Sequence, residues 1–279
     1  AAAVLAAFAS TPMGRGCELI DGAEALRRAP MLHPRTRAAL LSPHELRVES
    51  CDALPRLATW LEQAHGVRFF WGETVHEVDA PAVHTSRRTL RAERVALCPG
   101  TALTGVTADL LAPFGLRLTR LQMLRVRPET RWRLPGAVMG DLSLVRYGGF
   151  AALPEAAALR ADLEADAAPC LAHGIHVIAV QSADGTLVVG DSHHDDDAAG
   201  PFGPVASEAV DTLILSQLGE LLAPLRFEVV ERWVGHYPVG HDDDVLVVPA
   251  GDAVRVVVVT SGTGASIGFA IGEEVCASW

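Results

Sequence analysis

A run of valines followed by closely spaced glycines stands near the C-terminus, in "VRVVVVTSGTGASIG" at 254–268. Uninterrupted apolar residues are typical of a strand covered on both faces, as in a parallel sheet. Gly262 and Gly264 would let main-chain N–H groups approach a ligand, and a helix following them would direct its positive N-terminal end to the same place. The segment is therefore a candidate contact for a phosphate or a flavin. The alternative is an ordinary buried strand that ends in a glycine-rich turn.

A second apolar strand is expected in "VALCPG" at 95–100, where it ends in Pro99 and Gly100. Open α/β sheets bind ligands in the crevice at the carboxyl ends of their strands. The segment could therefore cross the same crevice as the glycine turn. Read alone, it fits a plain β-turn equally well.

Histidine and aspartate, which are metal-ligand types, gather in "GDSHHDDD" at 190–197 and in "HDDD" at 241–244. Adjacent residues of a strand point to opposite faces, so His193 and His194 cannot both face one ion without a bulge. No spaced second pair of ligands accompanies them, and we expect solvated acidic loops and no metal site. The sequence also has no G-x-S-x-G motif, which disfavours a hydrolase.

The composition excludes several classes of partner. The formal net charge is −11 and the isoelectric point is about 5.4, whereas nucleic acids and anionic membranes attract basic surfaces. No apolar run is long enough to span a bilayer. The five cysteines form no CxxC or Cys/His spacing, which favours reduced thiols in a cytoplasmic protein.

The pattern of apolar residues predicts the elements that must hold these segments. At 50–66 we expect a helix whose apolar face comprises Leu54, Leu57, Ala58, Leu61 and Ala64. Further helices are expected in the opening segment, within 151–168 and from Ser207 onward, and strands at "VRFFW", "TVHEV", "AVHTS", "RVALC", 116–128, both sides of Ala183-Asp184-Gly185, "RFEVVERWVGHYP" and "DVLVVPA". This order predicts a mixed α/β fold in which a β-rich insert interrupts a nucleotide-binding domain.

Several motifs in this order resemble a glycine-oxidase-like flavoprotein of the D-amino-acid oxidase superfamily: "VALCPG", "LQMLRV", "LSLVRY", "AHGIH", "VVGDSHH" and "VVVTSGTGASIGFAIGEEV". The chain is most similar to a subgroup associated with phosphonate catabolism. The resemblance implies an FAD-binding domain of glutathione-reductase type at 1–108 and 247–279, and an antiparallel substrate domain at 109–246. It also implies that the family's first βαβ unit, with G-x-G-x-x-G, is missing ahead of Ala1.

The resemblance assigns FAD contacts to three segments. Val75 would lie over the adenosine through its backbone, and Cys98, Pro99 and Gly100 would pass close to the cofactor. Main-chain amides would surround the flavin in the segment made of Thr260, Ser261, Gly262, Thr263, Gly264, Ala265 and Ser266.

For the substrate, His176 matches a tyrosine that lies at the substrate of glycine-oxidase-like relatives. Tyr237 and Gly262 stand where those relatives place two arginines that grip the carboxylate, so simple α-amino acid oxidation is not expected. Arg146 could bind an anionic group or merely end a strand, and His193 could line the same cavity. His176 and Tyr237 could equally be structural.

We therefore expect an FAD-dependent amine oxidase or dehydrogenase, acting on a small amine with an anionic tail such as 2-aminoethylphosphonate or an N-methyl relative. FAD would carry the chemistry, which explains why no acid/base pair stands out. A sarcosine or 2-hydroxy acid oxidase, or a non-catalytic module that only binds or assembles, remains an alternative. Homo-oligomers are compatible with the sequence.

Overall fold

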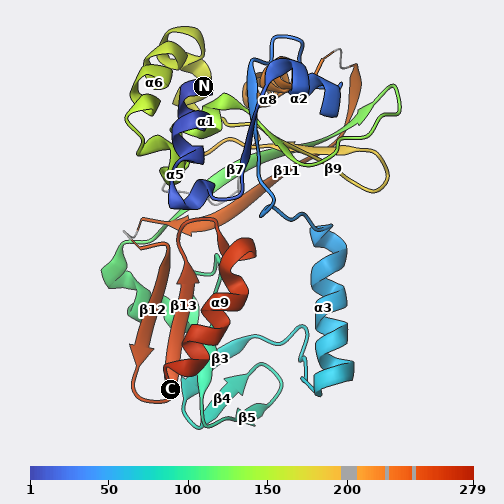
Figure 1. Ribbon diagram of the computed structural model, residues 1–279. Helices are drawn as coiled ribbons and strands as arrows, with labels where there is room; N and C mark the ends of the chain where they lie inside the picture. Colours follow the sequence, from blue (N-terminus) through green and yellow to red (C-terminus); the bar gives the residue numbers. More distant parts are fainter. Residues whose placement is uncertain (196–205, 224–225, 241–242) are drawn as a thin grey trace. The chain divides into compact units, whose positions relative to one another are not determined.

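The computed structural model describes residues 1–195, 206–223, 226–240 and 243–279. The chain forms two compact units (Figure 1). Unit 1 comprises Ala1–Glu49, Leu121–His194 and the described part of Pro204–Gly235, and unit 2 comprises mainly Ser50–Arg120 and the described part of His236–Trp279. None of the helices in these ranges combines the length and apolar character needed to cross a bilayer.

A five-stranded sheet is the centre of unit 1. Its strand order is β11-β7-β10-β9-β8, formed by β11 (Phe227–Val239), β7 (Arg117–Pro128), β10 (Leu187–Gly190), β9 (Ile178–Gln181) and β8 (Val138–Met139). β10 pairs antiparallel with both β7 and β9. Asp184 fixes the β9–β10 turn by accepting hydrogen bonds from the main-chain N–H (3.0 Å) and the hydroxyl (2.6 Å) of Thr186. The expected hairpin is confirmed.

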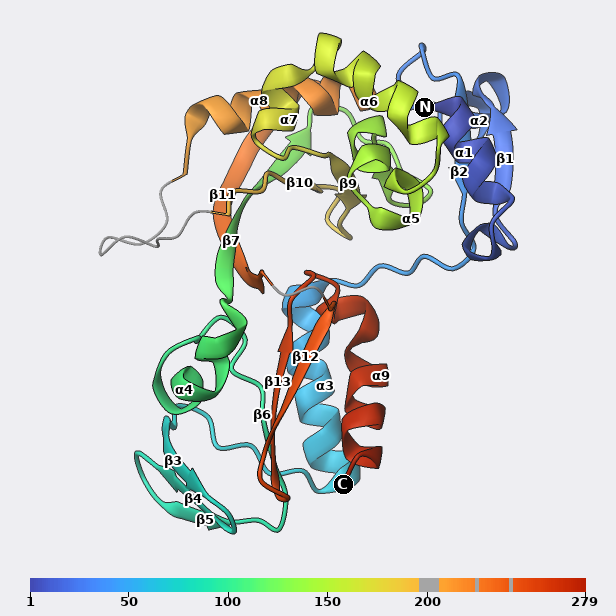
Figure 2. The same ribbon diagram turned by 90° about the vertical axis from the view of Figure 1, so that its left-hand side faces the viewer.

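Helices cover one face of this sheet, with α6 (Glu155–Asp166), α7 (Ala168–Ala172) and α8 (Glu208–Leu221) above the strands in Figure 2. α8 buries Val210, Ile214 and Leu218, which share one helical face because they are four residues apart. The rest of unit 1 contains α1 (Ala2–Ala9), α2 (Gly22–Arg28), α5 (Gly148–Ala151), the two-stranded sheet of β1 (Glu18–Asp21) and β2 (Ala38–Leu41), and the 3-10 turns η1 (Pro12–Gly14) and η4 (Asp141–Val145).

The core of unit 1 joins the sheet to these helices. Leu124 and Val126 of β7 are fully buried against Ile214 and Leu218 and other members of one apolar cluster. Between them Arg125 turns to the other face, where its guanidinium donates to Glu231 (2.9 Å). The strand expected at 116–128 is confirmed, and apolar and arginine residues alternate along this part of it.

Unit 2 contains two three-stranded sheets. One has the order β12-β13-β6, with β12 (Val245–Ala250), β13 (Val254–Val259) and β6 (Val95–Leu97), and the other joins β3 (Val75–Asp79), β4 (Ala82–Thr85) and β5 (Thr89–Arg91). Its helices are α3 (Ser50–His65), α4 (Ala108–Leu111) and α9 (Gly264–Ala277), with 3-10 turns η2 (Gly105–Thr107) and η3 (Ala112–Phe114). Its apolar cluster is small and is built on Leu111, Leu246, Val256 and Val258.

One expectation for unit 2 is wrong, and one predicted helix is more exposed than its apolar face suggests. The segment "VRFFW" at 67–71 is not a strand; Phe69 and Trp71 instead stack on each other, with ring centroids 5.0 Å apart. Helix α3 forms as predicted, but none of its residues, all of which are described, is buried, and Leu54 is 67% exposed. Its apolar face therefore contributes little burial to this unit.

The units divide the chain differently from the expected domains. One boundary between the units lies within β7, between Arg120 and Leu121, near the expected domain boundary at 108/109. Ala1–Glu49, which we expected in the FAD-binding domain, instead belongs to the same unit as the five-stranded sheet. Which unit holds the cofactor and which the substrate stays a prediction. The observed architecture is a mixed α/β fold rich in antiparallel pairing.

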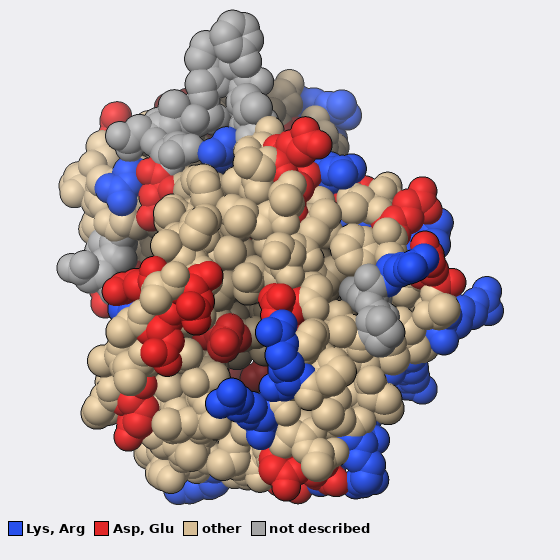
Figure 3. All heavy atoms as spheres, turned by 90° about the horizontal axis from the view of Figure 1, so that it is seen from above, with Lys and Arg blue, Asp and Glu red and all other residues tan. Residues whose placement is uncertain are grey.

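Charges of both signs share the molecular surface. On the described part of the face in Figure 3, acidic and basic side chains are interspersed, and the basic ones are all arginines because the sequence has no lysine. Ion pairs such as Arg28 to Glu18 (2.8 Å) and Arg28 to Glu24 (2.5 Å) balance charge locally. That face lacks the continuous basic patch that binding to a nucleic-acid backbone requires.

Candidate functional site

In unit 2, the two segments expected at one sheet edge are brought together. β13 and β6 pair in parallel, with Val254 opposite Val95 and Val256 opposite Leu97. Cys98, Pro99 and Gly100 therefore leave the sheet at the same edge as the turn that follows Val259. The expected neighbourhood of these segments in the sheet is confirmed, and it is the edge at which open α/β sheets bind ligands.

The turn after β13 is held by its own hydrogen bonds. The Thr260 N–H donates to the Asp244 carbonyl at 2.9 Å, and its hydroxyl donates to the Asp243 carbonyl. The hydroxyls of Ser261 and Thr263 lie 2.6 Å apart. These bonds tie the turn to the start of β12 and fix the direction in which the chain enters α9.

Gly262 and Tyr237, which the sequence comparison placed at equivalent substrate positions, are in contact within unit 2. Gly262 has φ +74°, a conformation that residues with a side chain rarely adopt. A Cβ built on Gly262 would lie 2.8 Å from the Cζ atom of Tyr237. The glycine is therefore required both for the turn and for the close approach of the phenol ring.

The N-terminus of α9 fits the anionic part of a cofactor. No side chain of the described residues caps this helix at Thr263, although α9 is 14 residues long. The first N–H groups of a helix have no partner within the helix and carry partial positive charge. Ala265, in the first turn, is exposed, so a phosphate or flavin oxygen could reach its N–H group, whereas the Ser266 N–H already donates to the Thr263 carbonyl at 2.8 Å. The chemistry of the residues present thus agrees with an anionic, main-chain-bound group such as FAD.

Val75 lies apart from this turn in the hydrogen-bonding scheme. It begins β3 and pairs with Thr85 of β4, in the three-stranded sheet that contains neither β6 nor β13. Its half-buried side chain and main chain belong to unit 2. Its contact with an adenosine stays a prediction.

In unit 1, the polar side chains converge just beyond the β9–β10 hairpin. His176 and Asp191 are directly opposite each other, because the His176 N–H donates to the Asp191 carbonyl (3.1 Å) and the Asp191 N–H donates to the His176 carbonyl (2.9 Å). His193 follows Asp191 by two residues, and alternate residues of an extended chain share a face. The side chains of all three residues consequently meet on one side.

The distances within this group are short. His176 Nε2 lies 3.0 Å from Asp191 Oδ1, and His193 Nδ1 lies 3.6 Å from the same oxygen. The ring centroids of His176 and His193 are 5.2 Å apart in a stacked arrangement. The His176 side chain is 3% exposed and the Asp191 side chain 18%, so the carboxylate is the member nearer to solvent. We call His176, Asp191 and His193 the His-Asp-His cluster.

The environment favours neutral imidazole at His193. Burial lowers the pKa of His193 to about 4, against the opposing effect of the Asp191 carboxylate, and the Arg146 charge lowers it further. His193 is therefore uncharged at neutral pH. The cluster then carries the negative charge of Asp191 without a balancing charge on His193.

The surrounding residues orient His176. Its Nδ1 atom lies 3.5 Å from the hydroxyl of Ser143, which is fully buried in η4. The Tyr147 ring packs edge-on against the His176 ring, with centroids 5.2 Å apart. Arg146, next to Tyr147, is exposed, and its positive charge contributes to the lowered pKa of His193. The structure thus brings together three of the four predicted substrate residues, Arg146, His176 and His193, while Tyr237 belongs to unit 2.

Sequence reasoning missed Asp191 and Ser143. It compared the adjacent His193 and His194, whereas the side chains that lie close to His193 are Asp191, two residues earlier, and His176, across the hairpin. The i, i+2 spacing of Asp191 and His193 in "GDSHH" was the available signal. The predicted acidic loops fall partly at 196–205 and 241–242, outside the described residues.

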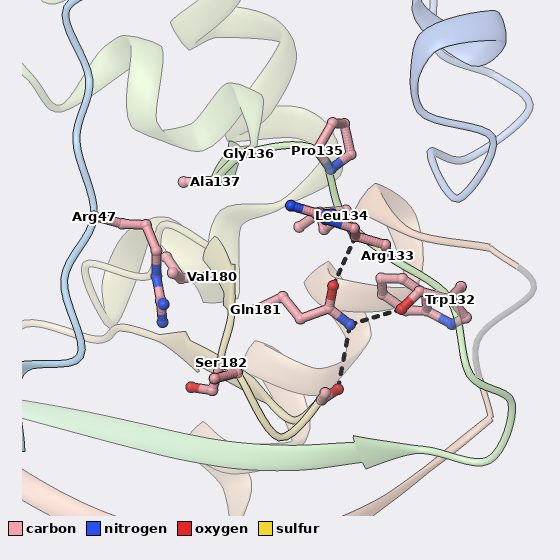
Figure 4. A pocket seen from close by; sticks show the side chains of 12 residues that line it. Arg47, Trp132, Arg133, Leu134, Pro135, Gly136, Ala137, Val180, Gln181 and Ser182 are labelled. Atoms are coloured by element: carbon pink, nitrogen blue, oxygen red, sulfur yellow. Dashed lines mark hydrogen bonds between the residues drawn. The ribbon is translucent and has the colours of Figure 1, made fainter.

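A separate hollow of ≈ 540 Å³ lies in unit 1 at the other end of the β9–β10 hairpin (Figure 4). Gln181 crosses it, with its amide donating to the carbonyls of Trp132 (2.9 Å) and Gly185 (3.3 Å), while its Oε1 accepts from the Leu134 N–H (2.7 Å). These bonds hold the main chain around the hollow in place. Its lining includes none of the predicted substrate residues.

Comparison with known proteins points to one family. The family model described as "DAO: FAD dependent oxidoreductase" matches residues 1–278. No curated protein matches the chain.

Among solved structures, glycine oxidase from Bacillus cereus superposes with a TM-score of 0.65 at 13% identity, over 91% of this chain and 62% of that one. L-proline dehydrogenase from P. horikoshii gives 0.71 at 14% identity, over 94% and 63%. Glycerol-3-phosphate dehydrogenase from Bacillus halodurans, complexed with FAD, gives 0.57 at 17% identity, over 93% and 48%. These similarities show a shared fold, and the chain spans less than two thirds of the length of each of these structures.

Proposed function

We propose, from the fact that this chain belongs to the DAO family of FAD-dependent oxidoreductases, that it oxidises a C–N bond of a small amine with an anionic tail. 2-Aminoethylphosphonate or an N-methyl derivative is the substrate that we put forward. Structural neighbours named glycine oxidase and L-proline dehydrogenase support the class of reaction. The phosphonate tail rests on the sequence resemblance described above.

The observation that carries the proposal is the uncapped N-terminus of α9 after the glycine turn. We assign the flavin and pyrophosphate side of FAD to the segment made of Thr260, Ser261, Gly262, Thr263, Gly264, Ala265 and Ser266, with Cys98, Pro99 and Gly100 beside it and Val75 over the adenosine. The main-chain N–H groups from Ser261 to Ala265 make the contacts, because those of Thr260 and Ser266 already donate to the carbonyls of Asp244 and Thr263. Bound FAD supplies the two-electron acceptor. The residues of this chain bind and orient it and exclude water from it.

For the substrate, we assign the anionic tail to Arg146, whose exposed guanidinium can bind a carboxylate or phosphonate through two N–H groups. His176 and His193 border the same place in unit 1. Tyr237, beside Gly262 in unit 2, stays a separate proposed substrate contact. Asp191 adds a negative charge beside the two histidines. An anionic tail can lie against this cluster only if a cation balances that carboxylate.

The remaining assignments are also proposals. Residues 1–108 and 247–279 would form the FAD-binding domain and 109–246 the substrate domain. We place the enzyme in the cytoplasm, a proposal that is supported by cysteines that are all free thiols. We assign it a small-molecule substrate, no nucleic-acid or membrane partner, and the capacity to form homo-oligomers.

The test is reduction of the flavin. The chain is loaded with FAD, and bleaching of the flavin absorbance is followed without oxygen as amines with and without an anionic tail are added. Arg146→Ala is expected to raise KM about tenfold or more for anionic amines, since a charge-assisted hydrogen bond contributes roughly 1.5–3 kcal/mol, and to leave neutral amines unaffected. The control is Arg35→Ala, which removes an exposed arginine of the same unit that pairs with Glu220.

Tyr237→Phe and His176→Asn complete the set, with larger expected effects on turnover or KM than on the unfolding temperature. A loaded chain that no amine reduces would refute the function. A chain that takes up no FAD would refute the cofactor site as well. If every variant matches the parent, the substrate site lies elsewhere.

A further inference from the structure

The His-Asp-His cluster also offers a set of metal-ligand atoms, a role that goes beyond the substrate contacts proposed above for its histidines. His176 Nε2, Asp191 Oδ1 and His193 Nδ1 all lie within 4.8 Å of one another. Two imidazole nitrogens and one carboxylate oxygen form a donor set that Zn²⁺ and Fe²⁺ sites commonly use. The set is buried or half-buried in unit 1 and does not involve unit 2.

The distances fit the edges of a coordination polyhedron. With metal–ligand bonds of about 2.1 Å, two ligand atoms are about 3.0 Å apart in octahedral geometry and about 3.4 Å apart in tetrahedral geometry. The observed separations from Asp191 Oδ1 are 3.0 Å to His176 Nε2 and 3.6 Å to His193 Nδ1. These two separations therefore fit the ligands of one ion, and the third separation, between the two imidazole nitrogens, is no more than 4.8 Å.

The orientation of the atoms also favours an ion. Although His176 Nε2 and Asp191 Oδ1 are 3.0 Å apart, neither has a hydrogen-bond partner within the described part of the chain, because the pair is not aligned for a hydrogen bond. Buried polar atoms without a hydrogen-bond partner are rare in folded proteins and call for an explanation, such as an ion that is bound between them. Ligands of one metal ion have this arrangement, since each points at the ion and not at its neighbour.

The surroundings resemble the support that metal-binding histidines usually have. The other ring nitrogen of His176 faces the Ser143 hydroxyl at 3.5 Å, and the His193 ring forms a hydrogen bond with the backbone of Gly174. A Cβ on Gly174 would lie 2.9 Å from the Cβ of His193, so this glycine packs directly against the ligand. Arg146 is a nearby cation and opposes a second positive charge, but it is exposed and screened by solvent.

We propose that His176, Asp191 and His193 form a binding site for one divalent transition-metal ion. Three protein ligands leave at least one coordination position open. If the proposed function holds, that position would accept an oxygen of the anionic tail, and the histidines would reach the substrate through the ion. The metal site itself does not depend on flavin or amine binding.

A second histidine pair provides an internal control. His173 and His194, in the same unit, form a hydrogen bond with each other between Nδ1 and Nε2, at 2.9 Å. His194 is next to His193 in sequence but is not a member of the cluster. His194→Ala therefore removes one histidine from the same segment while it keeps all the proposed ligands.

The experiment is titration of the full chain with Co²⁺, without flavin or amine, followed by the visible d–d absorption that cobalt shows at nitrogen and oxygen ligands. One Co²⁺ per chain is expected, displaceable by Zn²⁺. Asp191→Asn and His193→Gln are expected to weaken binding by about a hundredfold or more, because loss of a residue that only supports a metal ligand already costs about 10–100-fold. His194→Ala should bind within about threefold of the parent, well below that range.

Circular dichroism and the unfolding temperature establish that each variant is folded, and Asp191→Asn is nearly isosteric and should fold normally. Equal Co²⁺ binding by Asp191→Asn and the parent, or loss of the spectrum in His194→Ala, would overturn the site. So would the absence of a cobalt spectrum in the parent chain. Since no flavin is present, these outcomes leave the amine oxidation to be judged by its own assay.

Discussion

In unit 1 the polar groups that converge are side chains, whereas in unit 2 they are main-chain N–H groups at a helix end. His176, Asp191 and His193 meet because a hairpin places two of them opposite each other and the third two residues on. At the turn, the main chain can come close to Tyr237 because Gly262 has no side chain. The first kind of site is sensitive to the identity of each residue. The second is sensitive mainly to backbone conformation.

The two units also differ in how their helices are buried. In unit 1, α8 sends Val210, Ile214 and Leu218 into a core that includes the fully buried Leu124. In unit 2, α3 has no buried residue along its described length, and Phe269 of α9 is 81% exposed. The stability of the side-chain site therefore rests on a packed core, while the main-chain site belongs to a unit with much uncovered apolar surface.

The largest expected effect is the loss of stability when a buried side chain of unit 1 is shortened, compared with an exposed one of unit 2. Leu124→Ala should lower the free energy of unfolding of unit 1 by about 2–5 kcal/mol, because it leaves a cavity in a closed core. Leu54→Ala on α3 should change the stability by no more than about 0.5 kcal/mol, since this side chain is already exposed. Urea unfolding of both variants measures the difference. Equal losses would mean that α3 packs against apolar surface in solution.

A smaller effect is expected at the glycine turn. Gly262→Ala should cost about 1 kcal/mol for the left-handed backbone and an additional amount for the contact with Tyr237, and it should abolish or severely weaken FAD binding. The matched control is Gly251→Ala in the β12–β13 turn, where φ is also +74° and a Cβ would meet none of the described atoms within 4 Å. Flavin titration should distinguish the two variants. FAD affinity that falls equally in both would remove the special role of Gly262.

Thiol labelling gives a third, still milder test. Cys98 is exposed at the sheet edge assigned to the cofactor, and Cys51 and Cys276 are exposed elsewhere in unit 2. Bound FAD should slow alkylation of Cys98 and leave the other two thiols unchanged, as peptide mass spectrometry can measure. Slowing at all three would indicate a general stabilisation of the unit, and no slowing at Cys98 would exclude it from the cofactor contacts.

The smallest effect concerns the hairpin that leads to the His-Asp-His cluster. A side-chain hydrogen bond from Arg47, followed by the backbone N–H of Ala183, holds the pKa of Glu49 below its ordinary value of 4.5. A lowered pKa in the folded state stabilises the fold above pH 4.5, and this contribution is lost as the pH falls through the folded value. Glu49→Gln should thus lower stability at pH 7 by less than about 1 kcal/mol, since the side chain is partly exposed. The difference should shrink as the pH falls below 4.5, and a difference that is independent of pH would assign it to packing.

Much of this arrangement could be predicted from local sequence patterns. The alternation in β7, the Asp184-Gly185 turn and the valine run of β13 each depend on near neighbours in the chain, and the structure confirms them. The parallel pairing of β13 with β6 followed from two similar apolar strands. The exposure of α3 could not be predicted, because an apolar face indicates that burial is favourable but does not identify the surface that covers it.

The convergence of His176, Asp191 and His193 in unit 1 was not predicted, for a different reason. His176 and Asp191 are brought opposite each other by the register of the hairpin, which depends on long-range pairing of β10 with both β7 and β9. The Ser143 hydroxyl comes from η4, a short 3-10 turn with no regular sequence signal. A pair contributed from across a sheet becomes visible only when the register is known.

The most direct test of the cofactor site is hydrogen–deuterium exchange of the chain with and without FAD, resolved to peptides. The segment 260–266 contains the proposed main-chain contacts, so exchange of its N–H groups from Ser261 to Ala265 should slow markedly when FAD is added, with smaller changes at 98–100. Exchange at 260–266 that is unchanged in the presence of FAD, or protection confined to other segments, would contradict the account.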